Sequence, residues 1–340
     1  MFCRKSSISL TTDQIMSQLS FSEAEYVGKR KQARREKFLG EMDRTIPWDY
    51  LAGEVAKHYP LSSKVGRQPY PIETMLRIHF MQQWFALSDP AMEEALYDSL
   101  SMRQFAQLPG GRVPDETTIL NFRHLLEAHN IAEEMFEGVT LFLQAFGLVV
   151  RQGTIVDATI IDAPSSTKNE AGARDPEMRQ TKKGKNYFFG MKAHIGVDLH
   201  TGLVHTVVGT PANVADVTQV DKLLHGQENL VLGDAGYQGV DKRAEHEGRP
   251  VDWHIALRPS LRKKLSASVQ PMQQAYEHTK ASLRAKVEHP FRVTKRQFGY
   301  TKVRYRGLAK NTAQLKTLFA LANLWMARGQ VMAAMVQVRP

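Results

Sequence analysis

The hydrophobic period of this 340-residue chain changes at Gly153. Before that point, apolar residues recur at every third or fourth position, which is typical of amphipathic helices. After it, the run GTIVDATIID is rich in β-branched residues whose side chains alternate between two faces, the pattern of a strand. The chain is therefore predicted to form an all-α N-terminal domain followed by an α/β domain.

The helical part is expected between Pro47 and Gly147, where proline and glycine clusters separate the periodic segments. Asp115, which follows Pro114, is expected to cap one of these helices. The predicted core positions share helical spacing and are Leu76, Phe80, Trp84, Ile119, Phe122 and Leu126. Residues 1–45 are expected to form a disordered or basic lead-in, residues 46–150 the helical domain, residues 151–330 the α/β domain and residues 331–340 a tail.

In the α/β part, residues 163–185 are too poor in apolar side chains to pack and are expected to form a mobile loop. Two strands joined by the turn Leu199–Gly202 follow as a hairpin. An amphipathic helix over 213–224 and two short strands, NLVLG and DWHIAL, come next. A basic helix and an apolar helix from Asn311 close the domain.

The charge of the chain points to a polyanionic partner. Lys and Arg number 45 against 35 Asp and Glu, a net charge of +10 and a sequence pI near 9.6. The single cysteine, Cys3, excludes an internal disulfide and suits a reducing cytoplasm. No apolar run reaches the roughly 18–20 residues that span a bilayer, so no membrane partner is expected.

Three acidic residues stand in places where an acid needs an explanation. Asp157 lies inside an apolar strand, Asp234 closes another, and Glu288 is a lone acid in the basic run ASLRAKVEHPFRVTK. A desolvated carboxylate is costly unless something neutralises it. Taken singly, each acid also has an ordinary structural explanation. Asp157 could be hydrogen-bonded in the core, Asp234 could form a turn, and Glu288 could make an i,i+4 ion pair with Arg284.

Together, the three acids are suited to holding two Mg²⁺ ions about 4 Å apart, with Mn²⁺ as a substitute. Such a pair of ions catalyses phosphodiester cleavage and transfer. On an ideal helix Arg284, Glu288 and Lys295 would share an arc of roughly 40°, so that basic residues around the acid could hold DNA phosphates. Pro290 inside this helix is expected to kink or interrupt it.

These motifs resemble those of bacterial DDE-type insertion-sequence transposases, in the group named after insertion sequence five. IVDATII places the family's first aspartate on Asp157, LGDAGYQG places the second on Asp234 with Tyr237 following, and the Arg, Glu and Lys of the third motif fall on Arg284, Glu288 and Lys295. Ala281 stands where the family has a tyrosine, which puts the function of that tyrosine in doubt. The resemblance extends from about Ile46 to Arg328.

The resemblance implies a ribonuclease-H-like fold, a mixed sheet with flanking helices, preceded by the all-α N-terminal domain, which would bind DNA ends. It implies cleavage at terminal inverted repeats, joining of 3′ ends to target DNA, a homodimer on DNA, and a cytoplasmic, nucleoid-associated protein. Arg284 and Lys295 would contact DNA near the transposon end. A nuclease of the same fold that does not join, and an inactive DNA-binding protein, stay open as alternatives.

Further DNA contacts are expected from cations outside these motifs. The segment FGYTKVRYR interleaves aromatic and basic residues, as in stacking and phosphate contacts, or forms an amphipathic edge strand. The remaining candidates are Arg292, Lys302, Arg304, Arg306 and, on a polar helix face, Arg123. Near the hairpin, His194, Asp198, His200 and His205 suggest zinc, but their spacing matches no standard site.

Overall fold

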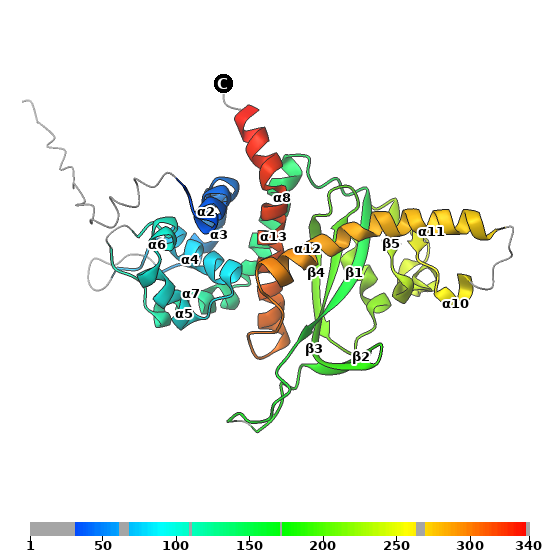
Figure 1. The fold of residues 1–340 in the computed structure, drawn as a ribbon, viewed down its shortest axis with the longest axis horizontal. Coiled ribbons are helices and arrows are strands. Elements are labelled where there is room, and N and C mark those ends of the chain that lie inside the picture. The colour runs from blue at the N-terminus through cyan, green and yellow to red at the C-terminus, as the bar shows by residue number, and fades with distance from the viewer. Residues whose placement is uncertain (1–30, 61–67, 109–110, 171, 263–268, 338–340) are drawn as a thin grey trace, which may run out of the picture.

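The computed structural model describes residues 31–60, 68–108, 111–170, 172–262 and 269–337. Residues 1–30 of the lead-in expected over 1–45, and residues 338–340 of the tail expected over 331–340, lie outside these ranges. Within the ranges described, the chain forms a helical region beside a mixed sheet with flanking helices (Figure 1). The α/β architecture expected after an all-α region is confirmed.

The N-terminal helices follow the predicted periodicity. Asp115 caps one of them as expected, because its carboxylate accepts a hydrogen bond of 2.7 Å from the amide of Thr118. The helices are α2 (Arg34–Thr45), α3 (Trp48–Ala56), α4 (Ile72–Phe85), α5 (Asp89–Asp98), α6 (Leu100–Phe105), α7 (Glu116–Ala128) and α8 (Ile131–Ala145). All six predicted core positions are buried: Leu76, Phe80, Trp84, Ile119, Phe122 and Leu126.

The sheet has six strands in the order β2-β3-β1-β5-β6, with β4 paired to β3 as well. The pairs β1–β3, β2–β3 and β3–β4 are antiparallel, whereas β1–β5 and β5–β6 are parallel. The expected hairpin and both short strands are confirmed. The strands are β1 (Gly153–Asp162), β2 (Arg179–Lys183), β3 (Asn186–Asp198), β4 (Val204–Pro211), β5 (Leu230–Gly233) and β6 (Asp252–Ile255).

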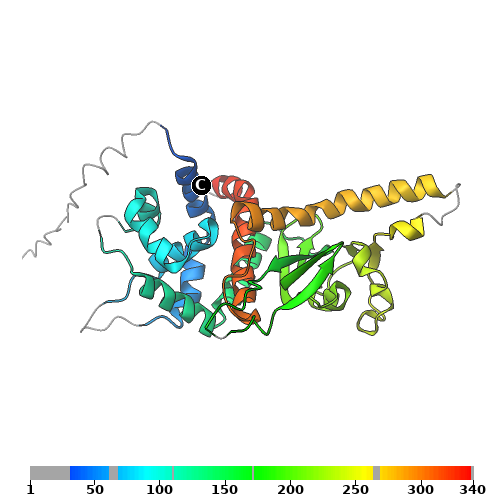
Figure 2. The same ribbon diagram turned by 60° about the horizontal axis from the view of Figure 1, so that its bottom comes forward.

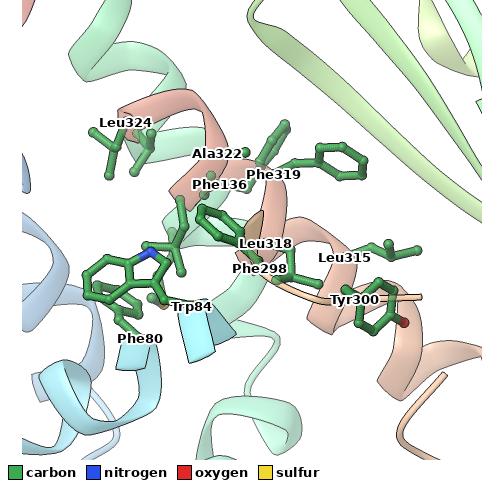
Figure 3. Packing of buried hydrophobic residues seen from close by; sticks show 14 of the residues in the cluster. Phe80, Trp84, Phe136, Phe298, Tyr300, Leu315, Leu318, Phe319, Ala322 and Leu324 are labelled. Carbon is green, nitrogen blue, oxygen red and sulfur yellow. The ribbon is translucent and has the colours of Figure 1, made fainter. Parts of the chain in front are cut away.

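One long helix, α13 (Leu308–Gln337), lies between the helical region and the sheet (Figures 1 and 2). It packs against α8, α2 and α4 on one side and against β4 on the other. Its apolar residues Leu318 and Phe319 join Phe80 and Trp84 from α4 in a single buried cluster (Figure 3). Helical region and sheet therefore share one hydrophobic core. No helix of the described ranges is long and apolar enough to cross a membrane.

The remaining elements lie around the sheet. They are the short helices η1 (Asp216–Gln219), α9 (Val220–Leu223), η2 (Ala235–Tyr237), η3 (Val240–Lys242), η4 (Ala244–His246) and α10 (Pro259–Arg262). A helical arm then runs through α11 (Gln270–Arg284), η5 (Ala285–Val287), α12 (Glu288–Arg292) and η6 (Val293–Gln297), as Figure 2 shows.

Three expectations about local structure are corrected. Arg34–Thr45 is a helix and no lead-in, because Leu39 and Met42 bury an apolar face that fixes it to the core. The predicted mobile loop contains β2, which pairs with β3 around the two-residue turn Gly184–Lys185; Gly184 has a φ of +63°, the conformation such tight turns require. The helix expected over 213–224 shortens to η1 and α9.

The segment FGYTKVRYR forms neither the exposed stacking surface nor the amphipathic edge strand expected from its sequence. Phe298 and Tyr300 are 2% exposed and belong to the core, so they are not available to stack on bases. The segment forms no strand; it contributes one isolated bridge between Lys302 and Asp162, at the end of β1. Burying these aromatic rings in the core lowers the free energy more than leaving them exposed as a stacking surface would, and this accounts for the difference.

Candidate active site

Asp157 and Asp234 lie at the centre of the sheet, on neighbouring parallel strands. Ile155 of β1 is the register partner of Leu232 of β5, so two residues further along each chain Asp157 comes opposite Asp234. Strand β5 ends at Gly233, whereas β1 continues to Asp162. The two aspartates therefore face each other where the sheet opens, at the carboxyl end of β5.

The electrostatics are consistent with this pairing. The pKa of Asp157 is raised to about 6, chiefly because its carboxyl is buried; the charge of Asp234 adds to the rise, while the amide of Ala158 and Arg284 oppose it. Asp157 Oδ1 accepts a hydrogen bond of 2.8 Å from its neighbour's amide, and Asp234 Oδ1 accepts one of 2.8 Å from Gly236. Each aspartate keeps a second oxygen for another partner.

The helical arm places Arg284 beside the first aspartate. Arg284 Nη1 lies 3.7 Å from Asp157 Oδ2, an ion pair that is longer than a hydrogen bond. The arm is held to the sheet region at two places after this point. Lys286 Nζ donates to the carbonyls of Leu199 and His200, and Lys295 Nζ donates to Thr159 Oγ1 at 2.7 Å and to a β1 carbonyl.

Glu288 is exposed and makes no contact with Asp157 or Asp234 that the structure records. The reason lies in η5, where the helix tightens into a 3₁₀ turn between Arg284 and Glu288. Three steps of 120° in place of 100° turn Glu288 about 60° away from the stripe predicted for an ideal helix. Pro290, which cannot donate to the carbonyl of Lys286, accompanies this change of winding. The sequence also allowed an intrahelical ion pair between Arg284 and Glu288. In the structure, Arg284 pairs with Asp157 instead.

Among the residues that the structure describes, no three His, Cys, Asp or Glu side chains are gathered closely enough to hold a metal ion. This includes the hairpin group suggested for zinc. There, Asp198 accepts hydrogen bonds from the backbone of Val150, Arg151 and His200, which explains its burial without a metal.

The donor set still suits a hard divalent cation. Two carboxylates from adjacent parallel strands, one within β1 and one at the end of β5, supply the oxygen ligands that Mg²⁺ and Mn²⁺ prefer. Burial is the main cause that raises the pKa of Asp157, and Arg284, at 3.7 Å, is its cationic partner. A cation at this position would stabilise the ionised carboxylate further.

Tyr237 is the site residue whose surroundings the sequence could not show. Its side chain is 1% exposed, and its hydroxyl has no hydrogen-bond partner in the described structure. Burial raises the pKa of Tyr237 well above its ordinary value, and the charges of Asp157, Asp216 and Asp234 add to that rise. The phenol of Tyr237 is therefore expected to stay protonated.

Asp216 is the acid that sequence reasoning missed. Asp216 falls in an amphipathic segment, and the sequence pattern there indicates a charged residue on a solvated helix face. In the structure its charge acts on both Asp157 and Tyr237. Only the packing of η1 against η2 brings it there, and no local pattern signals that contact.

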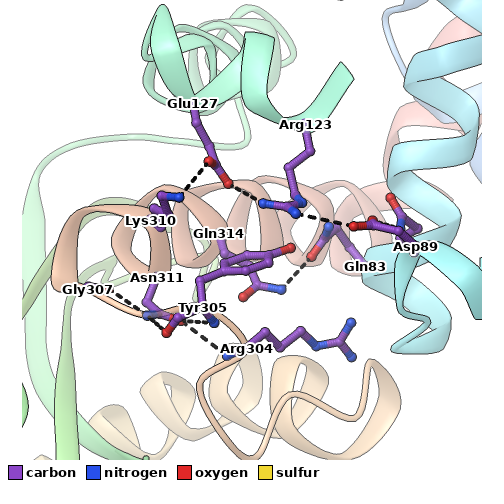
Figure 4. Close-up of polar contacts among 11 residues, drawn as sticks. Gln83, Asp89, Arg123, Glu127, Arg304, Tyr305, Gly307, Lys310, Asn311 and Gln314 are labelled. Atoms are coloured by element: carbon purple, nitrogen blue, oxygen red, sulfur yellow. Dashed lines mark hydrogen bonds and ion pairs between the residues drawn. The ribbon is translucent and has the colours of Figure 1, made fainter. Parts of the chain in front are cut away.

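The cations expected to bind DNA fall into two groups. Arg123 and Arg304 are used inside the protein. Arg123 is enclosed by Asp89, Glu127 and Tyr305 (Figure 4). Arg304 donates from Nη1 to the carbonyl of Leu87 at 3.1 Å.

The expected DNA contact of Arg123 is thus corrected to a contact between the helical region and the segment before α13. Lys295 likewise anchors the arm to β1. Exposed candidates that remain are Arg292, Lys302 and Arg306.

Comparison with known proteins agrees with this geometry. A family model described as a transposase DDE domain matches residues 150–324, just over half of the chain, and a second, described as a transposase domain, matches residues 27–125. A solved structure, the cryo-EM structure of piggyBac transposase in a synaptic complex with hairpin DNA, aligns over 87% of this chain and 74% of its own. Its TM-score is 0.42 and its identity 10%, values too low to support any argument.

The aspartates on adjacent parallel strands and the matched domain define the class: the chain is a DDE-domain protein with an acidic site on a mixed sheet. It belongs to the transposase DDE domain family. The resemblance inferred from the three motifs is thereby confirmed.

Proposed function

We propose that this protein cleaves DNA at the terminal inverted repeats of an insertion sequence and joins the freed 3′ ends to target DNA. The observation that supports this proposal is that Asp157, within β1, comes opposite Asp234, at the end of the adjacent parallel strand β5, in a chain of the transposase DDE domain family. Hydrolysis without joining, and DNA binding without chemistry, are the competing functions.

The proposed chemistry assigns a task to each residue of the site. Asp157 and Asp234 would bind the divalent cations, and Glu288 would supply the third carboxylate. When bound, a pair of such ions activates an attacking water or 3′-hydroxyl and stabilises the leaving oxygen. Arg284, released from Asp157 as the carboxylate binds a cation, would contact a DNA phosphate next to the scissile bond.

Glu288 must turn toward the aspartates to take this part. Rewinding η5 from a 3₁₀ turn to an α-helix would rotate Glu288 by about 60° back toward the face of Arg284. We propose that cation and DNA binding favour the rewound form.

The DNA would lie along the exposed cations of the arm and the segment after it. Arg292, Lys302 and Arg306 are exposed, and Lys302 lies beside the end of β1. Phosphate contacts of this kind make affinity strongly dependent on salt. Because an element has two ends, we propose that two copies of the protein act together on DNA.

The test is cleavage of a duplex that ends in the inverted repeat of the element, with Mg²⁺ or Mn²⁺. Asp157→Asn, Asp234→Asn and Glu288→Gln should each abolish cleavage while leaving the protein folded. Asp252→Asn, an exposed acid on β6, is the matched control and should keep activity. Cleavage that persists in Asp157→Asn or Asp234→Asn would refute the proposal.

The products separate the competing functions. Joined strands indicate a transposase, cut but unjoined ends indicate a nuclease, and specific binding with intact DNA indicates an inactive DNA-binding protein. Ala281 is exposed on α11, one turn before Arg284, so Ala281→Tyr adds the family's aromatic side chain without disturbing the core. We expect that variant to cut at least as fast as the natural sequence.

A further inference from the structure

The sheet continues into a two-stranded ribbon that extends past the end of β1. Strand β2 pairs with the first residues of β3, up to Gly190. Strand β1 ends at Asp162, the register partner of Gly190, and β4 reaches β3 only at Met191. In the described structure, residues 186–189 of β3 therefore pair with β2 alone, at the lower end of the sheet in Figure 1. Residues 179–190 are referred to as the basic ribbon.

One face of the basic ribbon continues the face of the sheet that carries Asp157. Asp157 lies opposite Ile195 of β3, and Tyr187 precedes Ile195 by an even number of residues, so it lies on the same face. Lys182 of β2 is the register partner of Tyr187 and shares that face. Lys183 lies on the other face. Cations therefore project from both faces of the ribbon.

The basic ribbon carries positive charge without any acid. Its cations are all exposed and are Arg179, Lys182, Lys183 and Lys185. Tyr187 is 65% exposed, and Nζ of Lys182 lies 5.4 Å from the centre of its ring. Exposed cations beside an aromatic ring are typical of surfaces that bind nucleic acids.

The base of the ribbon is fixed to the long helix α13. Asp175 Oδ2 accepts a hydrogen bond of 2.7 Å from the amide of Gly307, and Glu177 Oε2 accepts one of 2.5 Å from the amide of Leu308. Met178, the residue before β2, is 1% exposed and belongs to the core. The acids next to the ribbon are thus used inside the protein, and the anchored base sets the direction of the ribbon.

The length of the basic ribbon is close to one turn of a DNA duplex. Lys185, in the turn, precedes Ile195 by ten residues, and Ile195 lies opposite Asp157. At about 3.3 Å per residue, the turn lies at most about 33 Å along β3 from the level of Asp157. One turn of B-DNA is about 34 Å, or about 10 base pairs. A duplex held at Asp157 and running along β3 would therefore meet the turn one helical turn away.

We propose that the basic ribbon enters the major groove of the duplex that is cut, about one helical turn from the cleaved bond. The major groove is about 12 Å wide and admits a two-stranded β-ribbon. Cations on both faces of the ribbon meet the phosphates on both sides of the groove, where an acid would be repelled. This inference rests on the proposed function, because it takes the cleaved bond to lie at Asp157 and Asp234.

The first experiment measures DNA affinity without cleavage. The probe is a duplex that contains the inverted repeat and extends about 20 base pairs to each side of the cleaved bond. Fluorescence anisotropy without divalent cations gives its affinity at several salt concentrations. Lys182→Gln/Lys183→Gln should lower the salt slope by about two units, since each phosphate contact contributes about 0.9. Lys182→Arg/Lys183→Arg keeps both charges and should keep the slope.

A control of equal charge separates a local contact from general attraction. Lys222→Gln/Lys242→Gln removes two exposed cations from α9 and η3. These elements pack through Val220 and Val240 against Val156, on the face of the sheet opposite Asp157. The control should leave the salt slope unchanged, and thermal unfolding checks that every variant is folded.

The second experiment tests the distance between the ribbon and the site. Shortening one side of the duplex to about 6 base pairs removes the DNA that the turn would reach. The natural protein should then bind about tenfold more weakly or worse at about 0.1 M salt, whereas Lys182→Gln/Lys183→Gln should show no further loss. Hydroxyl-radical footprinting should show protection about 10 base pairs from the cleaved bond, and that protection should be absent with the variant.

The outcomes distinguish this inference from the proposed function. If Lys182→Gln/Lys183→Gln keeps the salt slope and the distant protection while Asp157→Asn abolishes cleavage, the inference is wrong and the proposed function stands. If the control lowers the slope equally, or if the lost protection lies next to the cleaved bond, the inference is also wrong. If only a duplex without the repeat loses affinity, the ribbon binds target DNA and the inference is wrong. If the natural protein does not cut the duplex, yet the variant loses slope and distant protection, the proposed function fails and the ribbon contact stands.

Discussion

Replacing Arg123 by methionine should destabilise the whole protein without changing its contacts with DNA. Nη1 of Arg123 lies 2.8 Å from Glu127, Nη2 lies 3.2 Å from Asp89, and the guanidinium lies 4.5 Å from the centre of the Tyr305 ring (Figure 4). Only 11% of the Arg123 side chain is exposed. Methionine keeps most of the volume and removes the charge.

The magnitude follows from what the two carboxylates lose. Removing one partner from a buried ion pair typically costs about 3–5 kcal/mol. Asp89 and Glu127 remain 20% and 17% exposed, and each keeps another partner, Gln82 and Lys310 respectively. Solvent and these partners reduce the expected loss of unfolding free energy to about 2–3 kcal/mol. For a chain of this size the melting temperature should fall by about 3–4 °C.

The assay is urea unfolding or differential scanning calorimetry, combined with the salt dependence of DNA affinity. Arg112→Met, which removes an exposed arginine, is the matched control and should leave stability unchanged. In a double-mutant cycle, Arg123→Met and Asp89→Asn should be less than additive, since the two side chains share one contact.

Two results would refute this reasoning. One is an unfolding free energy of Arg123→Met equal to that of the natural protein. The other is a fall of about one unit in the salt slope of DNA binding, which marks the loss of a phosphate contact. Either result would return Arg123 to the DNA-binding surface expected from the sequence.

Asn323→Ala should destabilise the protein by about 2–5 kcal/mol in urea unfolding, because the buried side chain of Asn323 satisfies both the N–H and the C=O of Val204; an unchanged midpoint would contradict this. Burial lowers the pKa of His79 to about 4 and of His205 to about 3, so the unfolded state binds more protons below pH 6.5. Stability should therefore fall from pH 6.5 downward, by about 2 kcal/mol per histidine at pH 5, and His205→Gln should flatten that dependence. Gly190→Ala should cost about 2 kcal/mol or more in thermal unfolding, because its Cβ would lie 2.1 Å from a carbonyl oxygen of β1; Gly40→Ala, with open space around it, is the control.

Much of this protein could be predicted from local patterns. The change of period at Gly153 separated the helical region from the sheet, and helical spacing identified Phe80 and Trp84 as core. An acid inside an apolar strand marked Asp157, and an acid at a strand end marked Asp234. These predictions depend on side chains within one element, where the 3.6- and two-residue periods decide which face is buried.

Other features were decided only by tertiary structure. Asp157 and Asp234 are 77 residues apart, and the parallel pairing of β1 with β5 makes them neighbours. The 3₁₀ turn η5 lies between Arg284 and Glu288, and Glu288 is exposed. A charged residue has the same local pattern whether it faces solvent, as Arg292 does, or lies enclosed by carboxylates, as Arg123 does. Which of these environments it meets depends on contacts with distant segments, and sequence periodicity carries no information about those contacts.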